Sequence, residues 1–153
     1  MPDLAREPVV ASIEGNGIAV RVADVGGQFL VSGEDMPANT IDGDERYAVW
    51  LAPGRRLAVG NAAPDGEFVS DVSDGFVVID ISGPRTDEML AMASPLDPAL
   101  LVPGRCAQTL FAGVKIVLYR HAAALRMHVE RPLAAWLLDW LRQATGALEG
   151  TVK

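Results

Sequence analysis

The sequence predicts a single α+β domain over residues 1–153, with helices packed on a mainly antiparallel sheet. Eight short segments rich in β-branched and aromatic residues lie between glycine, proline and aspartate turns, which is typical of strands. Two further segments repeat apolar residues at the helical period, and each follows a group of strands. At 153 residues the chain has the usual length of one domain.

The first half of the chain predicts two hairpins. Residues 1–16 contain prolines and glycines and predict an irregular lead-in. The turn sequences Gly26-Gly27 and Pro53-Gly54 each join two apolar segments, and the polar residues 32–46 between the hairpins predict a surface loop. The four predicted strands are Ile18–Val22, Gln28–Val31, Tyr47–Leu51 and Arg56–Gly60.

In the second half, a strand over Phe76–Ile81 precedes a helix that begins at Pro84 and is stopped by Pro95 and Pro98. Three more strands are predicted after it. In the last of them, three apolar residues alternate with Arg126 and His128, as expected for a strand with one face toward the solvent. The three strands are Cys106–Phe111, Val114–Tyr119 and Leu125–Val129.

The last helix has the strongest pattern in the sequence. Pro132 opens it, Gly146 fits the position just after its end, and residues 147–153 predict a frayed tail. Its predicted apolar face consists of Leu133, Trp136, Leu137, Trp140, Leu141 and Ala144.

Composition excludes several classes of partner and compartment. The formal net charge is -7 and the 13 Lys and Arg residues are dispersed, so nucleic acid is not an expected partner. The single cysteine cannot form an internal disulfide, which gives no indication of an oxidising compartment. The N-terminus lacks the pattern of a signal peptide, and no apolar run reaches the roughly 20 residues of a membrane helix. We therefore expect a cytoplasmic protein without a membrane partner.

No motif in the sequence predicts catalysis, a bound cofactor or a metal. The segment Gly15-Asn16-Gly17 is too short to bind a phosphate, and phosphate-loop motifs are absent. Only His121 and His128 are available as imidazole ligands, which is too few for a typical zinc site. Ser73, Asp74 and His121 supply the residue types of a catalytic triad, but the Gly-x-Ser-x-Gly motif is missing.

Five residues are candidates for contact with a partner protein. Arg105, Arg120 and Arg131 lie at predicted strand or helix ends, where a guanidinium can pair with a partner's carboxylate or remain a solvated surface cation. Trp136 and Trp140 are one helical turn apart; they fit the core, and one of them could extend beyond it to anchor an interface.

Cys106, beside one of these arginines, has two interpretations. A neighbouring cation can lower the pKa of a thiol and make it reactive. The alternative is a small, buried strand residue, which is the interpretation we favour.

Six segments over about residues 47–145 occur in the order of one known family. They are Val49–Val59, Ser70–Gly75, Ile81–Arg85, Pro95–Asp97, Pro103–Ala107 and Val129–Leu141. Together they resemble the gamma-subunit family of heterotetrameric sarcosine oxidase. The resemblance implies a fold like the folate-binding domain of the glycine-cleavage T-protein. It also implies assembly with alpha, beta and delta subunits, which carry FAD, FMN, NAD and tetrahydrofolate and oxidatively demethylate sarcosine. In this family the gamma subunit is not known to contribute catalytic residues.

The sequence departs from this family at two places. The stretch between Gly60 and Asp71 lacks the helix found there in the family, and Arg131-Pro132 replaces the more usual Arg-Ser. The complex could therefore act on a related N-methyl amine. The alternative interpretation is a free-standing folate or one-carbon binding protein, in which Asp80 or Glu130 would reach the pterin ring. A stand-alone hydrolase has no supporting motif.

Overall fold

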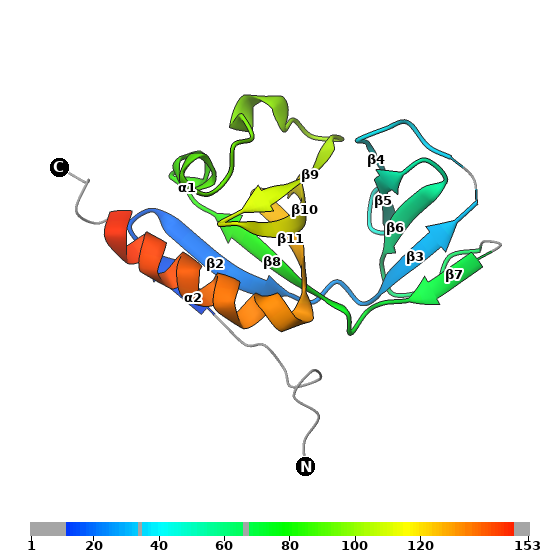
Figure 1. The fold of residues 1–153 in the computed structure, drawn as a ribbon, viewed down its shortest axis with the longest axis horizontal. Helices are drawn as coiled ribbons and strands as arrows, with labels where there is room; N and C mark the ends of the chain where they lie inside the picture. Colours follow the sequence, from blue (N-terminus) through cyan, green and yellow to red (C-terminus); the bar gives the residue numbers. More distant parts are fainter. Residues whose placement is uncertain (1–11, 34, 66–67, 149–153) are drawn as a thin grey trace, which may run out of the picture.

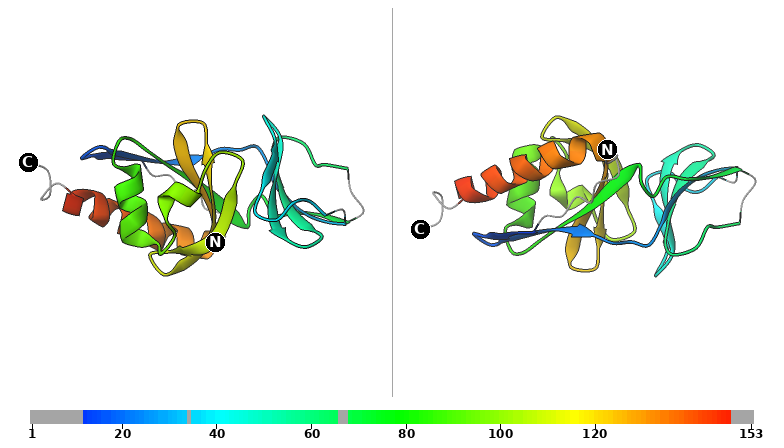
Figure 2. Two further views of the ribbon diagram at one scale, coloured as in Figure 1. Left: turned by 90° about the horizontal axis from the view of Figure 1, so that it is seen from above. Right: turned by 90° about the horizontal axis from the view of Figure 1, so that it is seen from below.

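The structure, a computed structural model, describes residues 12–33, 35–65 and 68–148, and its α+β fold confirms the predicted class. Two antiparallel sheets carry two α-helices (Figure 1). The six-stranded sheet has the order β1-β2-β8-β11-β10-β9, and the five-stranded sheet has the order β4-β5-β6-β3-β7. Figure 2 shows the helices beside the first sheet and the second sheet at the opposite end of the molecule.

The strands of the six-stranded sheet are β1 (Ser12–Gly15), β2 (Ile18–Ala23), β8 (Phe76–Ser82), β11 (Ala124–Glu130), β10 (Val114–His121) and β9 (Cys106–Phe111). Those of the five-stranded sheet are β4 (Ile41–Gly43), β5 (Tyr47–Ala52), β6 (Arg55–Val59), β3 (Gln28–Ser32) and β7 (Phe68–Asp71). The helical elements are α1 (Thr86–Ala93), the 3-10 turn η2 (Pro98–Leu100) and α2 (Arg131–Leu148).

Three of these strands were not predicted. β1 lies within the expected irregular lead-in, β4 lies within the expected loop, and β7 was not recognised. Each has only three or four residues, too few for an alternating pattern to stand out. The hairpin of β1 and β2 turns at Asn16-Gly17, where both residues have positive φ angles of 54° and 81°. Residues 1–11 lie outside the described residues.

One face of the six-stranded sheet forms an apolar core with α1 and α2. Alternate residues of its central strands point into this core. α1 begins two residues later than predicted, because Pro84 lies in the turn before it and Arg85 occupies the position that precedes the first helical residue. Among the described residues, no helix is long and apolar enough to span a membrane.

The buried stripe of α2 differs from the predicted one. Leu133 and Trp136 were placed on the apolar face but are 39% and 53% exposed. The helix also continues through Gly146 to Leu148, so the predicted end and the predicted start of the tail are wrong; residues 149–153 lie outside the description. Docking on the sheet sets the buried stripe to Ala134, Leu137, Leu138, Leu141, Ala144, Thr145 and Leu148.

The five-stranded sheet packs on the opposite face of the six-stranded sheet. A second core lies between the two sheets and consists of Tyr47, Val49, Leu57, Val59, Cys106 and Tyr119. The backbone closes this seam at one end, where Ile41 N donates to Gly104 O (3.0 Å) and Cys106 N donates to Asn39 O (2.9 Å).

This packing overturns the prediction for β11. The alternating pattern of that strand predicted Arg126 and His128 on a solvent-facing side, but they are only 9% and 1% exposed. The five-stranded sheet covers the face from which they project. β11 is therefore buried on both faces.

Candidate functional site

The main polar site of the molecule lies in the seam between the two sheets. Its side chains come from five strands and are held by the registers of those strands. All of them are less than one-tenth exposed. They are Gln28 of β3, Tyr47 of β5, Asp80 of β8, Tyr119 of β10, and Arg126 and His128 of β11.

An ion pair occupies one end of this seam network. Arg126 Nε and Nη2 each donate to a different carboxylate oxygen of Asp80, both at 2.8 Å. Arg126 Nη1 also donates to the Tyr47 hydroxyl oxygen at 3.1 Å. Burial alone would lower the pKa of Arg126, but the hydrogen bonds with Asp80 and Tyr47 outweigh it and raise the pKa. The guanidinium is therefore charged and its charge is offset inside the protein.

From Tyr47 a chain of hydrogen bonds continues through the seam. The hydroxyl groups of Tyr47 and Tyr119 are 2.5 Å apart, and the Tyr119 hydroxyl is 2.6 Å from His128 Nε2. His128 Nδ1 is 2.6 Å from Gln28 Oε1. Gln28 Nε2 donates to the backbone oxygen of Phe76 at 3.1 Å.

The ends of the chain fix the direction of every bond in it. Gln28 Nε2 faces carbonyl oxygens, so Gln28 Oε1 is left to accept a proton from His128 Nδ1. His128 Nε2 then accepts from the Tyr119 hydroxyl. At the other end Arg126 Nη1 can only donate, so the Tyr47 hydroxyl oxygen accepts this bond. The Tyr47 hydroxyl then donates its own hydrogen to the Tyr119 hydroxyl oxygen. The four hydrogen bonds from Arg126 through Tyr47, Tyr119 and His128 to Gln28 therefore run in one consistent direction, with neutral His128 protonated on Nδ1.

His128 and Tyr119 are not poised for proton transfer near neutral pH. Burial, with a smaller effect from the Arg126 charge, lowers the pKa of His128 to about 3. Burial also raises the pKa of Tyr119, and the neighbouring Tyr47 raises it further. A general acid or base works best with a pKa near the operating pH. The network is therefore suited to holding the two sheets together.

The other candidate reactive groups, Ser73 and Cys106, lack the partners that catalysis would need. The Ser73 hydroxyl donates to Asp71 (2.6 Å) and accepts from Gln28 N (3.0 Å), so its contacts are not those of a triad. Burial raises the pKa of the Cys106 thiol to about 11, against the smaller effects of a backbone hydrogen bond and of Arg105. Within the described ranges no three His, Cys, Asp or Glu side chains gather to hold a metal.

The three predicted arginines lie apart and have different surroundings. Arg105 is exposed at the start of β9. Arg120 donates to Asp87 (2.7 Å) and to the carbonyl oxygen of Leu101 (2.9 Å), which ties β10 to α1 and η2. Arg131 Nε donates to the Asp74 carbonyl oxygen at 2.7 Å. Contact of any of these with a partner stays a prediction.

The two tryptophans of α2 have separate roles in the fold. Trp140 is partly buried, and its ring packs edge-on against Phe111 with the ring centroids 5.7 Å apart. Trp136 is 53% exposed and lies beside exposed Leu133. Of the pair, Trp136 is thus the side chain that extends beyond the core, although its contact with a partner is untested.

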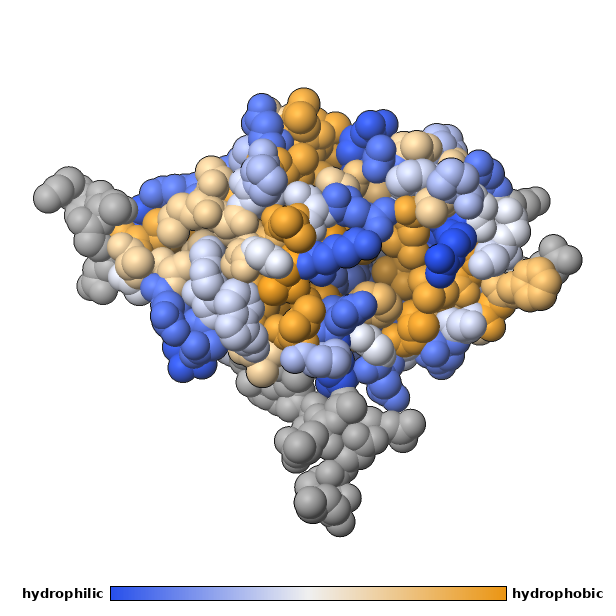
Figure 3. Space-filling view, in the orientation of Figure 1, coloured by the Kyte–Doolittle hydropathy of each residue, from blue (hydrophilic) through white to orange (hydrophobic). Residues whose placement is uncertain are grey.

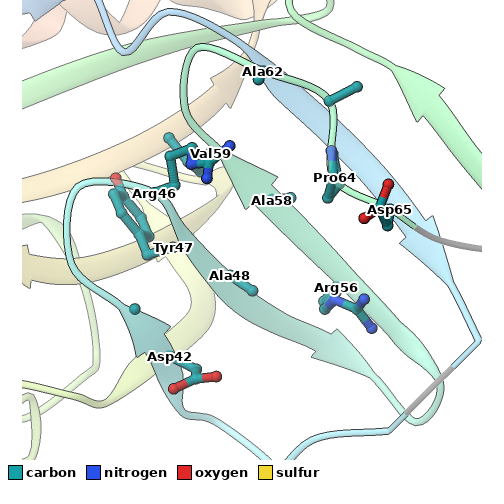
Figure 4. A pocket seen from close by; sticks show the side chains of 12 residues that line it. Asp42, Arg46, Tyr47, Ala48, Arg56, Ala58, Val59, Ala62, Pro64 and Asp65 are labelled. Atoms are coloured by element: carbon teal, nitrogen blue, oxygen red, sulfur yellow. The ribbon is translucent and has the colours of Figure 1, made fainter.

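Shallow hollows surround the five-stranded sheet. One of them, of about 600 Å³, lies over β5 and β6 and is lined in part by the cross-strand pair Ala48 and Ala58. Asp42, Arg56 and Asp65 are among its charged lining residues, and Figure 4 shows Asp65 beside β6. Its described lining contains no histidine, cysteine or serine, so these residues offer no imidazole base, thiol or serine hydroxyl.

Two smaller hollows of about 420 and 450 Å³ open along the seam and share Glu45, Tyr47 and His121. The imidazole of His121 lies 5.4 Å from the Tyr47 ring, measured between centroids. Partial burial and then the Arg126 charge lower the pKa of His121. In the view of Figure 3, hydrophilic residues gather at this boundary between the sheets, with apolar surface on either side.

The fold defines an α+β protein built from two packed antiparallel sheets and two helices. A similar fold occurs in a chain of heterotetrameric sarcosine oxidase from Corynebacterium sp. U-96, solved in complex with pyrrole 2-carboxylate. The two structures align with a TM-score of 0.78, covering 90% of this chain and 88% of that one, at 17% sequence identity. No protein-family model and no curated protein matches the sequence. The similarity shows a shared fold.

The seam network itself was missed by sequence reasoning. Tyr47, Tyr119 and Gln28 carry no motif, and Asp80 was considered only as a contact for a pterin ring. In the fold the carboxylate of Asp80 is bound on both oxygens by Arg126, so it is occupied within the chain. A signal was present in Arg126 and His128, which interrupt an otherwise apolar strand. If that face of the strand is covered by another part of the protein, the charged side chain needs a buried partner, because an unpaired buried charge is strongly destabilising.

Proposed function

We propose that this chain is a non-catalytic subunit of a heterotetrameric sarcosine oxidase-like flavoenzyme complex, with the assembly role of a gamma subunit. The observation that carries the proposal is the fold similarity over nearly the whole length of both chains. The ordered sequence segments between residues 47 and 145 support the same assignment independently of the fold.

The state of the buried polar groups agrees with an assembly role. Asp80, Tyr119 and His128 all bind other side chains of this chain. Under this proposal the flavins, NAD and tetrahydrofolate bind to the alpha and beta subunits of the cytoplasmic complex, where sarcosine or a related N-methyl amine is demethylated. This chain then contributes surface and stability.

The surface that we propose for the contact is the first part of α2. Leu133 and Trp136 are exposed there on consecutive turns, next to Arg131 at the start of the helix. An exposed tryptophan flanked by apolar and basic residues is a common anchor of protein interfaces. The Arg120 side chain, held against α1 and η2, is a less available contact.

Co-expression with alpha, beta and delta subunits, followed by size exclusion and an absorbance scan, tests the proposal. We expect this chain to co-elute with a complex that has flavin absorbance. Trp136→Glu should release the chain, whereas Leu100→Glu, at a site 68% exposed on η2, serves as the matched control and should not. A colourless chain that elutes alone and binds tetrahydrofolate in calorimetry would replace this proposal with a free-standing binding protein.

A further inference from the structure

The turn between β1 and β2 consists of two residues, Asn16 and Gly17, and it docks against the end of α2. Asn16 Nδ2 donates to the Thr145 carbonyl oxygen at 2.9 Å. Both turn residues adopt positive φ angles, and the pair Gly15 and Ile18 closes the hairpin around them. The side chain of Asn16 is half-buried in this contact.

Arg85 holds the same region from the other side. Its Nη1 donates to the Leu148 carbonyl oxygen (3.1 Å) and to the Asn16 carbonyl oxygen (3.5 Å). Its backbone N donates to the Gly17 carbonyl oxygen at 3.2 Å. Asn16 and Arg85 therefore bind two of the final carbonyl groups of α2, which have no partner within the helix.

An asparagine followed by glycine has a specific chemical weakness. The backbone nitrogen of the glycine can attack the asparagine Cγ, because glycine has no Cβ to hinder the approach. The new N–C bond closes a five-membered imide while the bond from Cγ to Nδ2 breaks and ammonia leaves. Water then opens the imide to aspartate or isoaspartate. No oxidant or enzyme is required.

We propose that Asn16 is a spontaneous deamidation site whose reactivity is controlled by the docking of this turn on α2. The bond from Nδ2 to the Thr145 carbonyl fixes the side chain, and the leaving nitrogen is the atom so held. The attack of Gly17 N requires the Asn16 side chain to rotate away from α2. The reaction therefore proceeds from the fraction of molecules in which the turn has locally opened.

The product cannot restore the docked state. A carboxylate at position 16 has no proton to donate to the Thr145 carbonyl oxygen, and it brings negative charge to the C-terminal end of a helix, where the dipole already opposes it. Isoaspartate also adds a methylene to the backbone of a two-residue turn. Conversion of Asn16 thus removes the contact with Thr145 irreversibly and weakens the docking of the last turn of α2, where the Arg85 bond to Leu148 remains.

Timed incubation of the purified full chain in mildly alkaline buffer tests the proposal. Trypsin releases the segment 7–21, in which mass spectrometry detects the deamidated form, and a synthetic peptide of the same segment gives the undocked rate. We expect the peptide to react fastest. The Arg85→Ala chain should react at least about tenfold faster than the wild-type chain, which corresponds to a loss of about 1.4 kcal/mol in the free energy that docks the turn on α2. Arg142→Ala, whose arginine pairs with exposed Asp139 on the same helix, is the control.

Three outcomes would overturn the proposal: equal rates in the wild-type chain and the peptide, equal rates in the wild type and Arg85→Ala, or no product in either chain while the peptide converts. If Arg85→Ala does not fold, Asn16→Asp provides a second test. Its backbone amides over residues 145–148 should exchange hydrogen faster than in the wild type. Asn61→Asp adds the same charge in an exposed loop and should leave that exchange unchanged.

Discussion

The two faces of the six-stranded sheet are stabilised in different ways, and β11 displays both. Leu125, Met127 and Val129 point into an apolar core under α1 and α2, whereas Arg126 and His128 point into the polar seam. Burial of each large apolar side chain contributes about 1.5–3 kcal/mol to stability and does not depend on a particular orientation of bonds. The seam depends on directional bonds, and each lost partner leaves a buried group unsatisfied.

This difference gives the faces different tasks. An apolar core of suitable volume tolerates similar side chains with little loss of stability. The seam network satisfies all its donors and acceptors only when β3, β5, β8, β10 and β11 have their observed registers. We infer that the apolar face supplies most of the folding free energy, and that the seam specifies how the second sheet docks.

The largest effect is expected where the seam loses a charge. Asp80→Ala leaves the Arg126 guanidinium buried without its counter-ion, and should cost about 3–5 kcal/mol of unfolding free energy in urea denaturation. Asp87→Ala is the matched control, because the Asp87 side chain is 62% exposed against 10% for Asp80, so its pair with Arg120 should contribute less than about 1 kcal/mol. Similar losses in both variants would show that the seam pair has no special importance.

On the apolar face, Leu137→Ala should cost about 2–5 kcal/mol, because this fully buried side chain of α2 leaves a cavity. Leu133→Ala, on the exposed side of the same helix, should cost less than about 1 kcal/mol, since it removes little buried area. Thermal and urea unfolding of the two variants measure the difference. A larger loss for Leu133→Ala would contradict the observed stripe and favour the one predicted from the sequence.

A single hydroxyl of the seam should matter less than its ion pair. Tyr119→Phe removes both the acceptor of the Tyr47 proton and the donor to His128 Nε2, at an expected cost of about 1–3 kcal/mol. Equilibrium unfolding of Tyr47→Phe, Tyr119→Phe and the double variant closes a cycle that isolates the coupling between the two hydroxyls, because Tyr47→Phe also removes the acceptor of Arg126 Nη1. If the costs of the two single variants simply add in the double variant, the hydroxyls are not coupled and the chain of bonds is not a unit.

Stability of the seam should depend on pH through His128. The folded protein lowers the pKa of His128 to about 3 from an ordinary value of 6.5, so between these values the unfolded chain binds a proton that the folded chain excludes. The free energy of unfolding should therefore fall as the pH decreases through this window, by about 1.4 kcal/mol per pH unit from this group. His128→Gln should show a shallower slope. An unchanged slope would show that His128 is not the group responsible.

The sequence predicted the fold class and the longer strands because these carry local signals. The β-branched run of β8, the alternation in β11 and the helical period of α2 all appear in the structure. The hairpin of β1 and β2 was missed although Asn16-Gly17 is a strong turn signal, because its first strand has only four residues. The buried stripe of α2 was shifted because helix docking, rather than local period, selects which residues are covered.

The seam could not be predicted from local pattern. Arg126 and His128 could face solvent or a second sheet, depending on how the five-stranded sheet packs over β11. The alternation of apolar and polar residues along β11 is the same in both cases. Their partners Gln28 and Tyr47 are 100 and 79 residues away from them in the chain. Such contacts are set by tertiary packing alone.

The activity of an assembled complex that contains a seam variant distinguishes an assembly role of this chain from a catalytic one. An assembly role predicts that Tyr119→Phe lowers the yield of the complex with the flavoprotein subunits, while turnover per bound flavin stays at the wild-type level. A fully assembled complex whose turnover per flavin falls by about tenfold or more, equivalent to about 1.4 kcal/mol in the barrier, would rule out a purely assembly role. That result would place a catalytic group in this chain.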